Sequence, residues 1–287
     1  MIKCVATDMD GTLVNSEQKI SVENSKAIKA AQREGVEVIV ATGRSYEEAA
    51  FLLKEAGIET FLICTNGAEV RNKKGEKLEA FGMSLDKIKA VEEVFNKHEL
   101  YFEVYTSDGT YSNDYDKALS VVMDIYMSAS LKNQYDELLK AAKKRFEEGK
   151  VKLIEEYEPL FQDSNILIYK MLAFSFDDEK LNRAREELKA FHGIAVSSSG
   201  KENIEVNSEE AQKGIALEKF VKSRGISLQE TMAIGDNYND LSMFHKAGRA
   251  VAMGNAPDEI KRHAHVVTKT NDEHGVAEAI ESIFKPV

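Results

Sequence analysis

Two aspartates near the start of the chain constrain its fold more than any other feature. The apolar run from Ile2 to Val5 predicts a buried strand, and Asp8 and Asp10 follow where that strand ends. Gly11 comes next and allows a sharp turn or a close approach of the backbone. Ligands of open α/β sheets bind beyond the carboxyl ends of strands, so a cation and a covalent role for one carboxylate would explain the pair. The plainer interpretation is that Asp10-Gly11 only forms a turn.

The order of the predicted elements places this first strand in an α/β fold. Val36 to Ala41 and Phe61 to Cys64 are predicted as further strands, and Ser21 and Ser45 can cap the helices between them. The alternation of strand and helix predicts a parallel sheet. The same rhythm resumes at Ser208 and continues towards the C-terminus.

The middle third of the chain follows a different pattern. A helix and an antiparallel hairpin come first, residues 114–161 are charged and mostly helical, and strand, helix and hairpin segments follow from 165 to 206. A length of 287 residues supports about two domains. We therefore expect one α/β domain, residues 1–82 and 207–287, interrupted by an α+β domain at residues 83–206.

Two further positions carry groups that can bind a phosphate. Thr42 and Gly43 follow the second strand, and a hydroxyl and a backbone N–H there can hold phosphate oxygens. Alternatively, Thr42 and Ser45 only end the strand and cap the next helix. Lys213 lies near a helix start, where the helix dipole disfavours a cation. A bound phosphate and a carboxylate pair would reverse that preference; otherwise Lys213 is one surface lysine among many.

A second acidic loop follows the strand predicted from Thr231 to Ile234. Asp236, Asn239 and Asp240 lie close together in this loop, directly after the strand. Mg²⁺ prefers carboxylate oxygens and keeps several waters, so such loops can share one ion with a substrate phosphate. The alternative is an acidic loop that only caps the helix after it.

The motifs D-x-D-G-T, T-G, K and G-D-x-x-N-D, in this order, resemble those of the haloacid dehalogenase (HAD) superfamily over both ends of the chain. The insertion after Asn66-Gly67-Ala68 resembles the large α/β cap of the Cof-type branch. The resemblance implies a Rossmann-like core with a parallel sheet and an inserted α+β cap domain. It also implies an enzyme, a hydrolase that acts on phosphate monoesters.

The resemblance further implies a role for each residue of the four motifs. Asp8 would be the nucleophile that forms an aspartyl-phosphate, and Asp10 would protonate the leaving oxygen and then activate water. The transferring phosphoryl group would be held by Thr42, Gly43, Lys213, Asn239 and the N–H of Met9. Mg²⁺ would be held by Asp8, Asp236 and the main-chain carbonyl of Asp10, with Asp240 as a further ligand or as a support for the ligands.

Composition excludes several other classes of protein. The net charge of −11 argues against a nucleic-acid partner and against an anionic membrane surface. We find no apolar run long enough to cross a membrane, so we expect a cytoplasmic protein. The two cysteines, Cys4 and Cys64, lie in predicted strands and are expected to be buried thiols.

The sequence therefore predicts a Mg²⁺-dependent phosphatase of small phosphorylated metabolites, such as sugar phosphates or phosphorylated cofactors. We expect a monomer or a weak homodimer. A phosphomutase or phosphotransferase would use the same Asp8 chemistry with a sugar hydroxyl in place of water. A non-catalytic sensor of phosphorylated metabolites is a third possibility, although binding alone does not need the acid/base group at Asp10.

Arg44 has two interpretations, a contact with substrate or cap and a surface ion pair.

Overall fold

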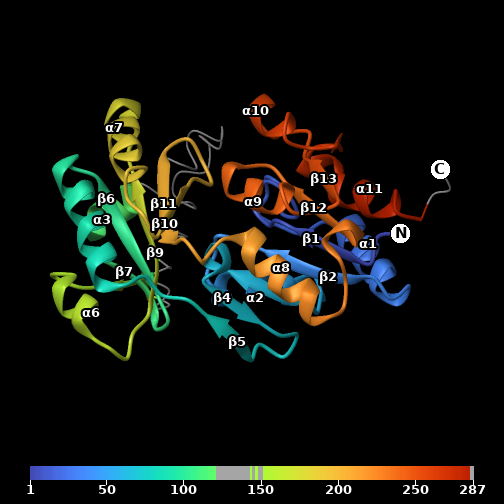
Figure 1. Ribbon diagram of the computed structural model, residues 1–287, viewed down its shortest axis with the longest axis horizontal. Helices are drawn as coiled ribbons and strands as arrows, with labels where there is room; N and C mark the ends of the chain where they lie inside the picture. Colours follow the sequence, from blue (N-terminus) through green and yellow to red (C-terminus); the bar gives the residue numbers. More distant parts are fainter. Residues whose placement is uncertain (121–142, 144–145, 148–150, 285–287) are drawn as a thin grey trace. The chain divides into compact units, whose positions relative to one another are not determined.

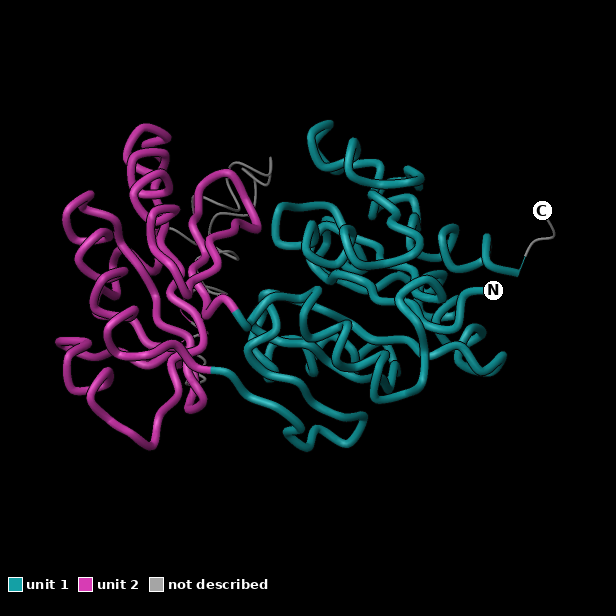
Figure 2. Tube along the Cα trace, viewed as in Figure 1, with its two compact units in different colours: residues 1–81, 210–287 teal, residues 82–209 magenta. Residues whose placement is uncertain are grey.

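The computed structural model describes residues 1–120, 143, 146–147 and 151–284. These residues form two compact units, which Figure 2 shows in different colours: unit 1 contains residues 1–81 and 210–287, and unit 2 contains residues 82–209. The chain thus leaves unit 1 once, forms unit 2 and returns. Much of the helical stretch predicted between residues 114 and 161 lies outside the described residues.

Unit 1 is built on one eight-stranded sheet. The strands from β14 to β3 are parallel to one another, and β4 and β5 are added antiparallel at one edge. In order across the sheet the strands are β14 (Val266–Val267), β13 (Arg249–Ala252), β12 (Thr231–Gly235), β1 (Cys4–Thr7), β2 (Glu37–Ala41), β3 (Phe61–Cys64), β4 (Glu69–Arg71) and β5 (Lys77–Ala80). The predicted α/β class with a parallel sheet is confirmed.

Helices cover both faces of this sheet, as can be followed in Figure 1. Side chains alternate along a strand, so Val5 of β1 packs on one face while Cys4 and Ala6 pack on the other. The first face is covered by α1 (Val22–Arg33), α2 (Tyr46–Glu55) and α11 (Gly275–Glu281). The second face is covered by α8 (Lys213–Ser223), α9 (Leu241–Phe244) and α10 (Asp258–Lys261). Because both faces are buried there, the central strands β12, β1, β2 and β3 are apolar almost throughout, whereas the edge strand β5 is mostly exposed.

The local signals set the element ends well near the N-terminus and less well near the C-terminus. The hydroxyl oxygens of Ser21 and Ser45 accept the N–H groups of Asn24 at 3.2 Å and Glu48 at 3.4 Å, which confirms both predicted caps. The sequence predicts a strand from His265 to Thr268, whereas β14 has only two residues. This strand lies at the edge of the sheet and has β13 as its single neighbour, so fewer pairings define it.

Unit 2 contains a six-stranded sheet that is antiparallel except for the β7–β8 pair. Its apolar face packs against α3 (Leu85–Lys97), α6 (Glu158–Gln162) and α7 (Asp178–Leu188). In order across the sheet the strands are β10 (Ile194–Ser197), β11 (Asn203–Ser208), β9 (Ile168–Phe174), β6 (Tyr101–Thr106), β7 (Gly109–Ser112) and β8 (Val151–Leu153). The described part of the chain contains no helix that is both long enough and apolar enough to cross a membrane.

Candidate active site

The first acidic loop begins at the carboxyl end of β1, in the middle of the parallel sheet. The Asp8 N–H donates to the carbonyl of Ile234 on β12 at 2.9 Å, which fixes where the loop leaves the sheet. Val14 N–H then donates to the Met9 carbonyl at 2.8 Å and folds the loop back. Gly11 has a φ of +73°, and a Cβ at this position would lie 2.5 Å from Oδ2 of Asp236. A glycine is therefore needed for the close approach of the two acidic loops.

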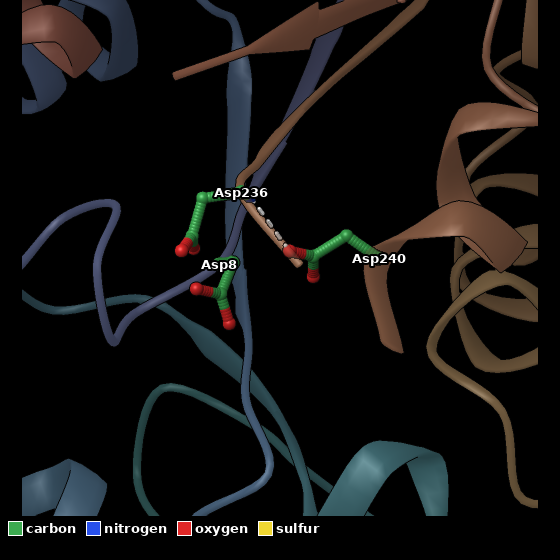
Figure 3. A group of neighbouring side chains, drawn as sticks. All are labelled: Asp8, Asp236 and Asp240. Carbon is green, nitrogen blue, oxygen red and sulfur yellow. Dashed lines mark hydrogen bonds between the residues drawn. The ribbon is translucent and has the colours of Figure 1, made fainter. Parts of the chain in front are cut away.

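Three aspartates from these two loops converge on one point. Ligand oxygens of Asp8, Asp236 and Asp240 all lie within 4.8 Å of one another. All three residues are buried, and Figure 3 shows their carboxyl groups together at the ends of the strands. Asp8 follows β1 and Asp236 follows β12, and because these strands are parallel neighbours, residues after them meet at the same edge.

Lys213 is completely buried beside this cluster. Its Nζ donates to Oδ1 of Asp8 at 2.6 Å and to Oδ1 of Asp240 at 2.7 Å. The residue opens α8, where the hydroxyl oxygen of Ser242 accepts the N–H of the next residue, Gly214, at 3.0 Å. A cation is unfavourable at a helix start, and the two carboxylates supply the compensating charge.

Asp240 uses both of its oxygens to hold the second acidic loop together. Oδ1 accepts from Lys213, while Oδ2 accepts the N–H groups of Asp236 at 2.9 Å and Asn237 at 3.0 Å. The dashed line in Figure 3 marks the bond from Asp236. Asp240 therefore organises the loop and Lys213, whereas Asp8 and Asp236 present their carboxyl groups beside it.

The cluster carries more negative than positive charge, and burial and mutual repulsion raise the pKa values of its carboxyl groups. The pKa of Asp8 is raised well above its usual 3.8 because it is buried and because Asp240 repels its charge, which Lys213 offsets only in part. Burial and the charge of Asp240 raise the pKa of Asp236 from 3.8 to about 7. Burial opposes the charge on Lys213, but the carboxylates of Asp240 and Asp8 outweigh it and raise the lysine pKa above 10.5.

These residues fit a hard divalent cation. Hard cations such as Mg²⁺ take oxygen ligands, and the cluster supplies carboxylate oxygens and contains neither cysteine nor histidine. A cation between Asp8 and Asp236 would relieve the repulsion that raises their pKa values.

Sequence reasoning missed Thr12, whose hydroxyl donates to Oδ1 of Asp236 at 2.8 Å and orients that carboxylate. The signal was available, because Thr12 is the last residue of the D-x-D-G-T motif.

The side chain of Asp10 does not belong to this group of three carboxylates. It is paired with Arg44, whose Nε donates to Oδ2 at 2.8 Å and whose Nη2 donates to Oδ1 at 2.5 Å. Arg44 also donates to Oε1 of Gln18 at 2.8 Å. Of the two interpretations of Arg44, the structure therefore shows an ion pair, and its partner is the predicted general acid.

The predicted phosphate-binding residues lie on loops at the same edge of the sheet. Thr42 directly follows β2 and is buried; its N–H donates to the Ile63 carbonyl at 2.8 Å, and its hydroxyl oxygen accepts the Arg44 N–H at 3.1 Å. Gly43 follows directly. Asn239 lies in the 3₁₀ turn η4 (Tyr238–Asp240) and donates from Nδ2 to Oδ1 of Asn66 at 3.2 Å. In the sequence Asn66 only marks the start of the insertion, and its contact with Asn239 is set by the tertiary structure.

Comparisons with known proteins agree over almost the entire chain. A family model described as haloacid dehalogenase-like hydrolase matches residues 5–280. The chain is 41% identical over 284 residues to the 5-amino-6-(5-phospho-D-ribitylamino)uracil phosphatase YwtE of Bacillus subtilis (strain 168), which covers 99% of this chain and 98% of that protein. It is 36% identical over 287 residues to the phosphatase YwpJ of the same organism, covering 99% of this chain and 100% of that protein.

Solved structures give the same result for the fold. A haloacid dehalogenase-like hydrolase from B. subtilis matches with a TM-score of 0.89 and 35% identity, covering 98% of this chain and 99% of that one. A haloacid dehalogenase-like hydrolase from Bacteroides thetaiotaomicron matches with a TM-score of 0.73 and 28% identity, covering 99% of this chain and 100% of that one. Each match includes both unit 1 and unit 2.

Proposed function

Given that the chain belongs to the haloacid dehalogenase-like hydrolase family, we propose that it hydrolyses small phosphate monoesters with the help of Mg²⁺. The family model and the two relatives confirm the resemblance seen in the motifs, and with it the assignment of the chain as a phosphatase of this family. What we propose in addition is the metal, the size of the substrate and the role of each residue. One observation carries this proposal: a buried Asp8 carboxylate, bonded to a buried Lys213, lies beside Asp236.

We assign the covalent step to Asp8. Phosphate-monoester hydrolysis is among the slowest uncatalysed reactions, and a covalent intermediate divides it into two displacements. An oxygen of Asp8 forms a bond to phosphorus while the bond to the leaving oxygen breaks, which gives an aspartyl-phosphate. Water then forms the new bond to phosphorus and releases Asp8. The bond from Lys213 holds the carboxyl group in place for both displacements, and the bond from the Asp8 N–H to the Ile234 carbonyl holds the backbone that carries it.

We assign the proton transfers to Asp10. It gives a proton to the leaving oxygen in the first displacement and takes one from water in the second. In the structure its carboxyl group is bonded to Arg44, so the transfer to the leaving oxygen requires this contact to open. Arg44 is thus placed to control which atoms Asp10 can reach.

Asp8, Asp236 and the main-chain carbonyl of Asp10 are the proposed ligands of Mg²⁺. When bound, the ion supplies positive charge that keeps a dianionic substrate from being repelled by the carboxylates. Asp240 supports these ligands through its bonds to Lys213 and to the N–H of Asp236. Its two oxygens are already engaged in this way, so we place it behind the ligands rather than among them.

The phosphoryl group is proposed to lie against donors from the neighbouring loops. Positioning and neutralisation of charge are the main needs of phosphoryl transfer. Lys213 supplies a full charge at the buried end of the site, and its pKa stays high enough for it to remain charged at neutral pH. The other proposed donors are the hydroxyl of Thr42, the N–H groups of Met9 and Gly43, and the amide of Asn239.

Residues 83–206 are proposed to act as the cap that selects the substrate, with residues 1–82 and 207–287 as the catalytic core. The sheet of unit 2 contains a buried ion pair between Lys170 and Glu205, whose atoms Nζ and Oε1 are 2.9 Å apart. Lys170 also lies over the ring of Tyr105, with Nζ 4.4 Å from the ring centre. A buried ion pair is weak evidence for a role in stability, and we propose that this one serves the recognition of a polar substrate.

The test is release of inorganic phosphate from a panel of small phosphomonoesters, with Mg²⁺ and with a chelator. The panel includes sugar phosphates, phosphorylated cofactors and 5-amino-6-(5-phospho-D-ribitylamino)uracil, because the name of a relative with 41% identity specifies that compound. We expect release that needs Mg²⁺, that is lost in Asp8→Asn and that is unchanged in Asp178→Asn, a matched change at an exposed position of α7.

Two outcomes would contradict this proposal. An isomerised phosphoester without released phosphate would identify a mutase. No reaction with any ester, from protein that still binds Mg²⁺, would favour a sensor of phosphorylated metabolites.

A further inference from the structure

The turn after β3 is strained and buried. Thr65, Asn66 and Gly67 have φ values of 46°, 59° and 109°, so three consecutive residues occupy the left-handed region. Such a conformation is uncommon for residues other than glycine and is an outlier for β-branched threonine. Thr65 and Asn66 are almost completely buried, with exposed fractions of 2% and 3%. Strain of this kind persists only where the surrounding structure enforces it, and it is concentrated at functional sites.

The turn contacts all three segments to which we assigned phosphate binding outside the D-x-D-G-T loop. The Asn66 N–H donates to the carbonyl of Thr42 at 2.9 Å. The Asn66 side chain accepts from Nδ2 of Asn239 at 3.2 Å. A Cβ on Gly67 would lie 2.6 Å from the carbonyl oxygen of Gln212, the residue before Lys213. A conformation without strain at this turn would move its backbone away from at least one of these segments.

We infer that Asn66 is a positioning residue of the phosphoryl site and that it acts through Asn239. The inference rests on the proposed function, because it takes Asn239 as a phosphate donor. Nδ2 of Asn239 carries two hydrogens, and Oδ1 of Asn66 accepts one of them. This bond fixes the rotation of the Asn239 amide and leaves the second hydrogen with a defined direction. An asparagine amide without such a bond can turn its oxygen towards an anion and repel it.

The plainer explanation of Asn66 is that asparagine tolerates the left-handed backbone better than other side chains. Asn66→Gly separates the two explanations. Glycine accepts this conformation without strain, so the backbone contacts to Thr42 and Gln212 remain and the fold is not weakened on that account. The side-chain bond to Asn239 is lost.

The decisive measurement is the affinity for inorganic phosphate in the presence of Mg²⁺, by calorimetry, beside kcat/KM for the best ester of the panel. We expect Asn66→Gly to weaken phosphate binding about five- to tenfold, which corresponds to one hydrogen bond. In the Asn239→Ala background the same change should add no further loss, because the two residues act as one unit. Glu99→Gly is the control: it removes a left-handed side chain at φ 54° in unit 2 and should leave phosphate binding unchanged.

Each other result overturns the inference. If Asn66→Gly binds phosphate as tightly as the unmodified chain, Asn66 does not act through Asn239. The same holds if the loss of phosphate affinity in Asn66→Gly adds fully to the loss in Asn239→Ala. If the glycine variant fails to fold, the role of the side chain is structural. If the unmodified chain releases phosphate and the variant keeps the same kcat/KM, the inference alone fails. If the unmodified chain releases no phosphate from any ester, the proposed function fails as well.

Discussion

Replacing Asp236 by asparagine should stabilise the metal-free protein while it removes a proposed metal ligand. In the absence of a cation, burial and the charge of Asp240 raise the pKa of Asp236 from 3.8 to about 7. The folded state therefore binds the proton of this carboxyl group more tightly than the unfolded state. Its stability falls as the pH rises from about 4 towards 7, because the buried group must then ionise or keep its proton at a cost.

The size of this effect follows from the shift in pKa. Each unit corresponds to about 1.4 kcal/mol, so the raised pKa of Asp236 lowers the stability of the metal-free fold, relative to low pH, by up to about 4 kcal/mol at pH 8 and by about 2 kcal/mol at pH 5. Asparagine has nearly the same shape, and its Oδ1 can still accept the hydroxyl of Thr12. Asp236→Asn should therefore gain most of this free energy at pH 8, less at pH 5, and almost none near pH 3.

The assay is urea unfolding in a chelator at pH 5 and pH 8, followed by titration with Mg²⁺ at each pH. The unmodified protein should gain stability with Mg²⁺, more strongly at pH 8, because protonated Asp236 competes with the ion at pH 5. The variant should gain much less. Asp258→Asn is the control, because the Asp258 side chain is 93% exposed in the same unit and should shift neither curve.

An asparagine variant that is no more stable than the unmodified protein in chelator at pH 8 would refute this reasoning. It would mean that Asp236 is not held against electrostatic repulsion in the folded state. Electrostatic repulsion at Asp236 would then no longer favour a cation between the acidic loops.

Three further substitutions test the contacts that build the site. Lys213→Met leaves buried carboxylates without their cation and should lower the free energy of unfolding by about 3–5 kcal/mol, measured by urea unfolding in chelator. Lys222→Met is the control, because Lys222 is exposed on the same helix; it should change the free energy of unfolding by less than about 0.5 kcal/mol. Gly11→Ala combines a left-handed backbone with a Cβ that meets Asp236, so stability should fall by about 1–3 kcal/mol and more Mg²⁺ should be needed for half-maximal phosphate release. Thr12→Val removes a bond that lowers the pKa of Asp236, so the pH midpoint of Mg²⁺ binding should rise; an unchanged midpoint would show that this bond does not matter.

Most of the elements of unit 1 could be predicted because their signals are local. Apolar runs of strand length and serine caps lie within a few residues of the structure that they determine. The two serine caps at Ser21 and Ser45 are confirmed in this way. The edge strand β14 was predicted too long, since the extent of an edge strand depends on its pairing with one neighbour rather than on its own residues.

The residues able to do chemistry can be identified from their positions along the chain, whereas the way they are used depends on contacts between distant segments. The acidic loops were visible because each follows an apolar strand, and parallel strands deliver the residues after them to one edge of the sheet. The contact of Thr12 with Asp236 joins residues 224 apart, and the contact of Lys213 with Asp8 joins residues 205 apart. The pairing of Asp10 with Arg44 likewise depends on the order of β1 and β2 in the sheet. Such partners are set by strand order and by the loop conformations, which no local pattern of residues specifies.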